Sequence, residues 1–566
     1  MKYILRYKTN QEFNEDQIEK AGKDVQPGEH IWFPVPGVSF TNEAKISDYN
    51  PIPKNVPTLI FVNETNNVGT VTLKAKQLGT GSYFTSLPSR PAIELEYSND
   101  NQFFNTTAST SDPQTGEVLS FTLPANGKLY LRGSNNTFAV GKIISDASHT
   151  YSIDIAIKYW SFNCNVRHSL EGNLMALLND DTGVTENFEL AGLFENDDML
   201  REVADSVLSS EYIPYGAYAF LFRQTQNTQY GLEKMPKIDA EEIGAWGCYK
   251  TFENATFETA TEIPALTLDS GACYAMFANS NHLTGMTSPI PNASGNWYAW
   301  SSMFHNCTAL TNAPEILVDH ACPRSMMHMF GGCSSLVNPP EMHLSDFGFW
   351  NRDTNNYTIE CCGYMFQYCT SLVRTPSFFS GLTGSNWVGF IFQYMFRGCT
   401  SLTQAADLGY NGTIGQFAYR SMFEGCTSLV NGPKIKATRC DKGCSMHQMF
   451  KNCTSLTTAP EISLTSFYGP RTSNALAEMF AGCTSLTGVT LLPATLDTSC
   501  YKSMFSGCTN LSYIKCLATT MTATDCTTGW VEGVASNGTF VKAASADWSV
   551  KTGNDGIPAG WTVQDA

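Results

Sequence analysis

The 19 cysteines are the side chains of this 566-residue chain with the widest chemistry, because thiolates form disulfides, bind zinc and act as nucleophiles. Eighteen of them lie between Cys248 and Cys526, and eight recur every 25–36 residues, each three residues after a Met-Phe pair. A cysteine that recurs in this way is expected to be a small, buried packing residue. The eight are Cys307, Cys333, Cys369, Cys399, Cys426, Cys453, Cys483 and Cys508.

The remaining polar motifs do not assemble a reaction site. Cys361-Cys362 and the Cys440-x-x-x-Cys444 spacing could bind a metal, but no histidine cluster accompanies them. The nine histidines include no His-Glu-x-x-His motif, and the chain contains no Gly-x-Ser-x-Gly elbow. The repeat columns carry Ser, Thr, Cys and Met where a glycosidase needs paired carboxylates. The sequence therefore predicts no enzyme, no cofactor and no metal site.

Aromatic residues gather in three segments that interrupt an otherwise regular repeat. Aromatic rings beside Asn, Asp and Arg form the flat apolar platform with planar polar groups that a sugar ring or a protein epitope needs. The alternative is that the rings pack on one another and only hold long loops in place. The candidate ligand-binding residues are Trp297, Tyr298, Trp300, Trp350, Asp353, Asn356, Tyr357 and Trp387.

The charge of the chain argues against nucleic acid as a partner. The formal net charge is −17, and a phosphate backbone would be repelled. Between Cys164 and Tyr212 there are 11 Asp and Glu residues against two arginines. This segment is either a solvated acidic face or a docking face for a basic partner or a cation. Residues 179–183 carry a weak likeness to a calcium loop but lack its number of ligands.

The elements that would position these residues belong to an internal repeat. Eight clear copies contain Met-Phe, a cysteine three residues after Phe and a leucine six after it. Weaker copies upstream bring the total to about 12, with Phe194 first, Phe505 last and a mean spacing of about 28 residues, as in leucine-rich repeats. The segments around Met-Phe, such as residues 501–505, are expected to form one or two helical turns. The segments after the leucine are expected to be extended, since proline opposes a helix there. Each unit would bury its apolar face only by stacking on the next.

Upstream of the repeats the pattern changes to that of strands. Val71 and Leu73 alternate with Thr72 and Lys74 between Gly, Asn, Pro and Ser turns, which predicts an antiparallel sandwich. The expected fold class is multidomain α+β, with a β-sandwich-like domain followed by a solenoid and a C-terminal cap. The expected parts are an attachment segment at 1–55, the sandwich at 56–163, a helical lead-in at 164–192, the solenoid at 193–515 and the cap at 516–566.

The repeat unit resembles the BspA-like leucine-rich repeats of surface and phage proteins of gut anaerobes. The likeness rests on Met-Phe-x-x-Cys-Thr-Ser-Leu and on the Pro-Glu-Ile that follows it, as at 460–462, and it covers residues 193 to about 515. The Trp-rich end from Trp530 to Trp561 looks like the segment that closes such arrays, and residues 56–163 look like the β module that precedes them. The resemblance implies a non-enzymatic surface protein that recognises a partner.

The first eight residues contain no apolar stretch typical of a secretory signal, and no run is long enough to span a membrane. A surface-type protein without an export signal is expected to leave the cell on a virus particle. We therefore expect a virion fibre or decoration that binds a host-surface glycan or protein and neighbouring virion proteins, without nucleic acid or membrane insertion. A homotrimer is a candidate assembly. The alternatives are a bacterial cell-surface adhesin and a structural module that binds only its virion neighbours.

Overall fold

The structure, a computed structural model, describes residues 4–5, 31–32 and 57–566. Gaps in the last range fall at 80–86, 102–103, 109–117, 146–152, 179–183, 185, 209, 227, 292–295, 319, 345, 348–359, 378–389, 410–412, 442 and 469–473. The chain divides into a unit of residues 1–56 and a unit of residues 57–566. In the first unit, β1 (Ile4–Leu5) pairs antiparallel with β2 (Ile31–Trp32), and the rest of the expected attachment segment lies outside the described residues.

Two sheets open the second unit. The four-stranded sheet has the order β7-β4-β10-β9, and the six-stranded sheet has the order β12-β11-β3-β8-β5-β6. The strands are β3 (Leu59–Asn63), β4 (Gly69–Leu78), β5 (Glu94–Ser98), β6 (Asn105–Ala108), β7 (Val118–Leu123), β8 (Lys128–Gly133), β9 (Ala139–Ser145), β10 (Ile153–Cys164), β11 (His168–Gly172) and β12 (Leu200–Val203). The sheets pack face to face, with the Phe61 and Phe162 rings in edge contact at 5.6 Å. In β4, Val71 and Leu73 are buried, as their alternation predicts.

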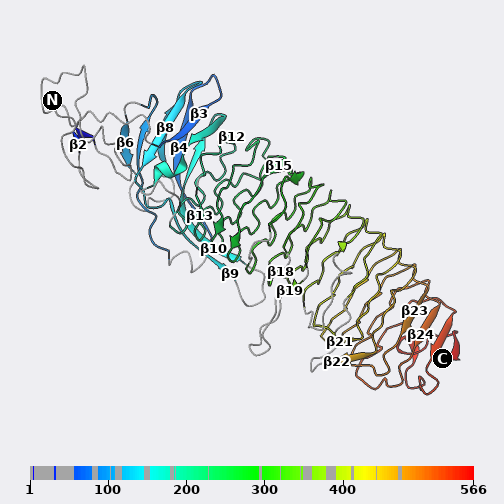
Figure 1. Ribbon diagram of the computed structural model, residues 1–566. Coiled ribbons are helices and arrows are strands. Elements are labelled where there is room, and N and C mark those ends of the chain that lie inside the picture. Colours follow the sequence, from blue (N-terminus) through cyan, green and yellow to red (C-terminus); the bar gives the residue numbers. More distant parts are fainter. Residues whose placement is uncertain are drawn as a thin grey trace. The chain divides into compact units, whose positions relative to one another are not determined.

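The sandwich continues into a solenoid without a break in the hydrophobic core. Strand β12, which follows the first repeat phenylalanine, pairs parallel with β11 of the six-stranded sheet. One buried cluster extends from Leu59 to Trp561. Successive coils then stack in parallel register (Figure 1).

Short parallel strands mark corresponding edges of the coils. They are β13 (Tyr212–Ile213), β14 (Glu242–Ile243) and β16 (Thr267–Leu268); β15 (Thr259–Ala260) and β17 (Gly285–Met286); β18 (His320–Ala321) and β19 (Asp346–Phe347); and β20 (Thr413–Ile414), β21 (Arg439–Asp441) and β22 (Ser466–Tyr468). The last sheet, in the order β23-β24-β25-β26, contains β23 (Gly488–Leu491), β24 (Tyr513–Cys516), β25 (Thr539–Lys542) and β26 (Thr562–Asp565).

The predicted α+β class is wrong, because the described residues contain no α-helix. Their helical elements are the 3-10 turns η2 (Leu174–Leu177), within the expected helical lead-in, and η5 (Gly553–Asp555). The segments around Met-Phe form a ribbon of consecutive turns instead. In the coil of Phe480, the amide of Met479 bonds locally to Leu476, whereas the amides of Glu478 and Phe480 bond to the next coil at 2.9 and 3.0 Å. Alternate amides thus join neighbouring coils, which an α-helix would not allow.

The repeat phenylalanines form a continuous column of stacked rings. Neighbouring centroids lie 5.5–5.9 Å apart, with interplanar angles of 2–20°. The column contains Phe194, Phe222, Phe252, Phe277, Phe304, Phe330, Phe366, Phe396, Phe423, Phe450, Phe480 and Phe505. At its end Trp530 packs on Phe505, and Trp548 stacks on Trp530 at 5.4 Å. The Trp-rich segment therefore covers the last layer of the stack.

The eight repeat cysteines are buried thiols with a defined hydrogen-bonding role. Each Sγ lies 3.0–3.1 Å from the carbonyl oxygen of the phenylalanine one coil earlier, to which it donates. Ser280 makes the same bond to Phe252 with its hydroxyl. The column therefore requires a small side chain that can donate to a buried carbonyl. The described residues contain no disulfide.

We expect the repeat cysteines to resist alkylation until the protein unfolds. Burial raises the pKa of Cys307, Cys369 and Cys453 to about 12, and only the thiolate is nucleophilic. With iodoacetamide at pH 8, peptide mass spectrometry should find label first at the partly exposed Cys322 and Cys444, and at the repeat cysteines only in denaturant. Rapid native labelling of Cys453 would contradict this burial.

Candidate functional site: the turn face of the solenoid

The turn ribbon presents one set of side chains inward and another outward. With the repeat phenylalanine as position 0, positions −4, −1, 0 and +3 are buried, as in Tyr419, Met422, Phe423 and Cys426. Positions −6, −3, −2, +1 and +2 point away from this core, and we call their side chains the turn face. A residue with positive φ recurs every four positions, at −6, −2 and +2. This is the conformation that the third residue of a type II turn adopts.

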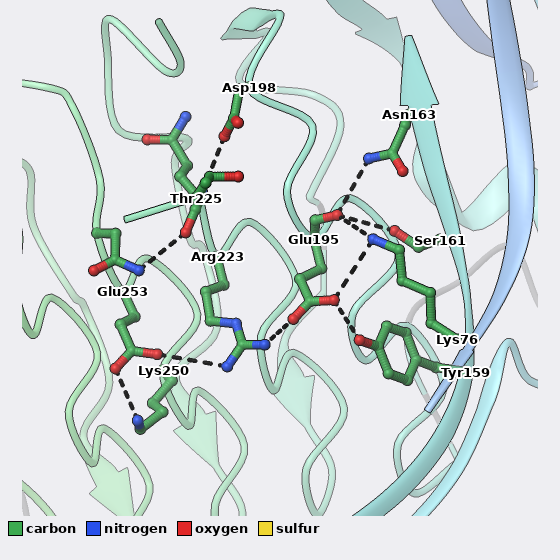
Figure 2. A network of polar contacts seen from close by, with 12 residues as sticks. Lys76, Tyr159, Ser161, Asn163, Glu195, Asp198, Arg223, Thr225, Lys250 and Glu253 are labelled. Carbon is green, nitrogen blue, oxygen red and sulfur yellow. Dashed lines mark hydrogen bonds and ion pairs between the residues drawn. The ribbon is translucent and has the colours of Figure 1, made fainter. Parts of the chain in front are cut away.

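On the first three coils, the turn face carries an ion-pair network that joins the solenoid to the sandwich (Figure 2). The Glu195 carboxylate, 2% exposed, pairs with Arg223 and accepts a hydrogen bond from the Tyr159 hydroxyl. Lys76 of β4 lies 3.6 Å from the same carboxylate and donates to the Glu195 carbonyl at 2.8 Å. Arg223 continues to Glu253 at 3.7 Å, and Glu253 pairs with Lys250 at 2.8 Å.

Burial sets the protonation of the groups around Glu195. It lowers the pKa of Lys76, and the Glu195 charge opposes that shift. It raises the pKa of Tyr159, and the neighbouring carboxylate raises it further. The tyrosine therefore remains a neutral donor. Glu195 belongs to the acidic segment between Cys164 and Tyr212, and its neighbours within the protein already satisfy it. The weak calcium-loop likeness at 179–183 lies outside the described residues.

A second buried pair links β11 to the first coil. The His168 Nε2 lies 3.3 Å from the Asp197 Oδ2, and the exposures of the two side chains are 0% and 1%. The contact is an ion pair without hydrogen-bond geometry, since neither atom has a hydrogen-bond partner. Burial alone lowers the pKa of His168, but the Asp197 charge outweighs it and raises the pKa to about 10. His168 is therefore charged at neutral pH.

This pair predicts a specific pH dependence of stability. The pKa of His168 is about 10 in the folded protein and about 6.5 when unfolded, so its contribution is complete below about pH 6.5 and is lost as pH rises through about 10. We expect the wild type to lose stability between pH 7 and pH 10 relative to Asp197→Asn. Urea unfolding across this range measures the difference, and parallel profiles would refute the assignment.

Of the eight candidate ligand-binding residues, Trp297, Tyr298 and Trp300 lie within the described part of the chain. Trp350, Asp353, Asn356, Tyr357 and Trp387 lie outside the described residues. Trp300 is 1% exposed at an inward position, and Tyr298 is 6% exposed, with its hydroxyl bonded to Arg324. Trp297 is half-buried against the outer apolar cluster that also contains Tyr298. In this segment, Trp300 and Tyr298 are buried, and Trp297 is partly exposed.

Farther along, stacked rings and cations occupy the turn face. His328 stacks on Tyr364 at 4.4 Å, and Tyr364 stacks on Tyr394 at 4.8 Å. The guanidinium groups of Arg397 and Arg420 lie 5.5 and 5.6 Å from the Tyr394 centroid. Burial lowers the pKa of His328 to about 3, so the imidazole is neutral at pH 7. These rings cover one another's faces and leave mainly their edges to solvent.

Tyr368, which the sequence analysis missed, differs from these rings. It is 51% exposed, and no ring stacks on it among the described residues. Its position +2 is occupied in ten of the twelve coils by Asn or Gly with positive φ, and only these two residues adopt that conformation readily. The ten are Asn196, Asn254, Asn279, Asn306, Gly332, Gly398, Gly425, Asn452, Gly482 and Gly507. The other exception is Gln224. Among the eight copies with a cysteine, alignment on Phe shows Tyr368 as Phe-Gln-Tyr-Cys instead of Phe-x-Asn/Gly-Cys.

Within the described ranges, no group of three or more His, Cys, Asp or Glu side chains is arranged to hold a metal ion. Nor does any helix of that part of the chain combine the length and apolar character that crossing a bilayer requires.

Comparison with known proteins gives two structural neighbours. No protein-family model and no curated protein matches the chain. A leucine-rich repeat protein from Bacteroides ovatus is 13% identical, with a TM-score of 0.31, and the match covers 75% of this chain and 98% of that one. A leucine-rich repeat protein from Eubacterium ventriosum is 12% identical, with a TM-score of 0.26, and the match covers 74% and 97%. These superpositions are partial, and they say nothing of what this chain binds.

Proposed function

We propose that this chain is a non-enzymatic recognition protein, carried on a phage particle as a fibre or decoration, that attaches to the host cell surface through the turn face of its solenoid. The observation that carries the proposal is the change in the turn face at the coils of Phe366 and Phe396. There the Asn/Gly column admits an exposed tyrosine, and Arg397, together with Arg420 of the next coil, lies over the Tyr394 ring.

The longest connection of the repeat leads into the same region. Phe330 and Phe366 are 36 residues apart, whereas the other neighbouring repeat phenylalanines are 25–30 residues apart. This connection ends just before Glu360, at position −6 in the coil of Phe366. Insertions in solenoids map to loops on one face, often the binding face. The coil that carries Tyr368 therefore also follows the longest insertion, as expected for a recognition surface.

Cell binding by the labelled full chain tests the proposal. We expect the chain to bind some members of a panel of gut anaerobes, and Arg397→Ala to weaken that binding. Lys451→Ala is the matched control, because Arg397 and Lys451 both occupy position +1 of their coils. Arg397 pairs with Glu424 at 3.1 Å, and Lys451 pairs with Glu478 at 2.6 Å. Equal binding by the two variants would refute the location, and no binding to any isolate would refute the function.

Two alternatives give different outcomes. A bacterial adhesin would bind cells but would be found on the surface of the bacterium that makes it, whereas a virion protein would be labelled on purified particles by an antibody. A purely structural virion module would be labelled on particles and would bind no cells.

A further inference from the structure

The Tyr368 ring lies against the backbone of Gly398 in the next coil. A Cβ built on Gly398 would lie 2.4 Å from the Tyr368 Cδ1, so the ring sits directly over the Gly398 backbone in the next coil. The preceding coil has Gly332 at the same position and places no side chain there against the ring. The Tyr368 ring is thus half exposed. The residues at position +2 of the two neighbouring coils contact one side of the ring at most and do not cover it.

A tyrosine is unusual at this position, which Asn or Gly occupies in ten of the twelve coils. Its φ is 61°, close to the 59° and 56° of Tyr364 and Tyr394 on the same face. Those two rings stack on each other, whereas 51% of the Tyr368 side chain remains in solvent. The exposed ring is therefore available to a ligand.

Polar groups occupy neighbouring positions of the turn face. Arg397, whose carbonyl accepts from the Tyr368 amide at 2.8 Å, pairs with Glu424 through two contacts of 3.1 and 3.3 Å. The pair supplies donors and acceptors together, with its charges balanced, and the Arg420 guanidinium lies farther along, 5.6 Å from the Tyr394 centroid. The half-buried Gln367 at position +1 adds an amide, whose side chain makes no hydrogen bond within the described part of the chain. These donors and acceptors suit the hydroxyl groups of a sugar.

We propose that Tyr368 is the platform of a subsite for one uncharged pyranose ring of a surface glycan. The apolar C–H face of the sugar packs on the open tyrosine face, while its hydroxyls bond to Gln367, Arg397 and Glu424. The inference rests on the proposed function and narrows its ligand to a neutral saccharide. We expect the affinity of this subsite for a single sugar to lie in the millimolar range, on the order of 1 mM.

Saturation-transfer NMR on the full chain tests the subsite. The probes are the methyl glycosides of glucose, galactose, mannose and N-acetylglucosamine, with glucuronic acid and N-acetylneuraminic acid as charged comparisons. At least one neutral glycoside should bind more tightly than both acids. Binding of the acids alone, or of no probe, would overturn the proposal.

Substitutions at Tyr368 separate binding from folding. Tyr368→Asn installs the residue usual for the column, so the melting temperature should stay equal or rise while affinity falls at least about tenfold. Tyr368→Phe should retain binding within about threefold, since the ring face remains. Unchanged binding by Tyr368→Asn would overturn the platform role.

Two glycine variants provide a matched pair if Tyr368→Asn perturbs folding. Gly398 and Gly425 both have φ of +74°, but a Cβ on Gly425 meets nothing nearer than Gly398 at 3.8 Å. Gly398→Ala and Gly425→Ala should therefore lower the melting temperature alike, and only Gly398→Ala, which displaces the ring, should weaken sugar binding. Equal affinities of the two would overturn the proposal.

The same variants distinguish this inference from the function on which it rests. If wild type and Tyr368→Asn bind cells equally, the subsite is wrong and the recognition function stands. If no cells are bound while methyl glycosides bind at Tyr368, the subsite stands and the cell-surface function is wrong.

Discussion

Replacing Phe423 by alanine is expected to lower the free energy of unfolding by about 3–5 kcal/mol, the usual cost of removing a fully buried ring. Phe423 is 0% exposed and lies between Phe396 at 5.6 Å and Phe450 at 5.5 Å, so the substitution opens the aromatic column on both sides. In a solenoid each repeat contacts only its neighbours. The loss should therefore appear first as faster hydrogen exchange in the coils of Phe396, Phe423 and Phe450.

The matched control for this prediction is Lys436→Ala, an exposed position between Phe423 and Phe450, which should change stability by no more than about 0.5 kcal/mol. Mass spectrometry measures the rate of hydrogen exchange in each coil of both variants. Unchanged exchange in the coils of Phe396 and Phe450 would contradict a stability built from contacts between neighbouring coils.

Glu195→Ala is expected to cost about 3–5 kcal/mol, because it leaves Arg223 and Lys76 without their carboxylate in a largely buried site. Glu195 is 2% exposed, and Arg223 and Lys76 are 19% and 23% exposed, so water replaces the lost partner poorly. The network joins β4 and β10 to the first three coils. Limited proteolysis should therefore detect opening where the sandwich meets the solenoid.

Glu171→Ala is the control for this loss of an ion pair. Glu171 contacts Lys128 at 2.5 Å, but the two side chains are 44% and 38% exposed. A solvated pair of this kind contributes at most about 1 kcal/mol. Urea unfolding that gave equal losses for Glu195→Ala and Glu171→Ala would contradict the role assigned to burial.

The sequence was sufficient to predict the stacked repeat but not its backbone. In the coil of Phe423, the buried Tyr419, Met422, Phe423 and Cys426 have the spacing i, i+3, i+4, i+7, which is also that of a helix buried on one face. A turn ribbon produces the same spacing, so periodicity alone favoured helical turns. The Gly or Asn at +2, just before seven of the eight repeat cysteines, was the signal for the turns, because it marks positive φ that a helix interior does not contain.

The candidate site was predictable only in kind. The sequence drew attention to aromatic rings on interrupted repeats, but it could not show that Trp300 is buried while Tyr368 is exposed. That distinction depends on position relative to Phe within a ribbon of turns, so it requires the backbone. The buried pairs of Glu195 and Asp197 were missed for a related reason: their partners Lys76 and His168 come from the sandwich, 119 and 29 residues away in sequence.

The most direct measurement of the central claim, that the turn face at the coils of Phe366 and Phe396 contacts a surface ligand, is site-specific photocrosslinking. A photoreactive phenylalanine analogue is placed at position 368 in one full-length protein and at position 457 in another. Thr457 is also exposed but lies outside the turn face. After illumination on bound cells, we predict covalent adducts with cell-surface material at position 368 and none at 457. Adducts at 457 alone, or in equal yield at both positions, would contradict the account.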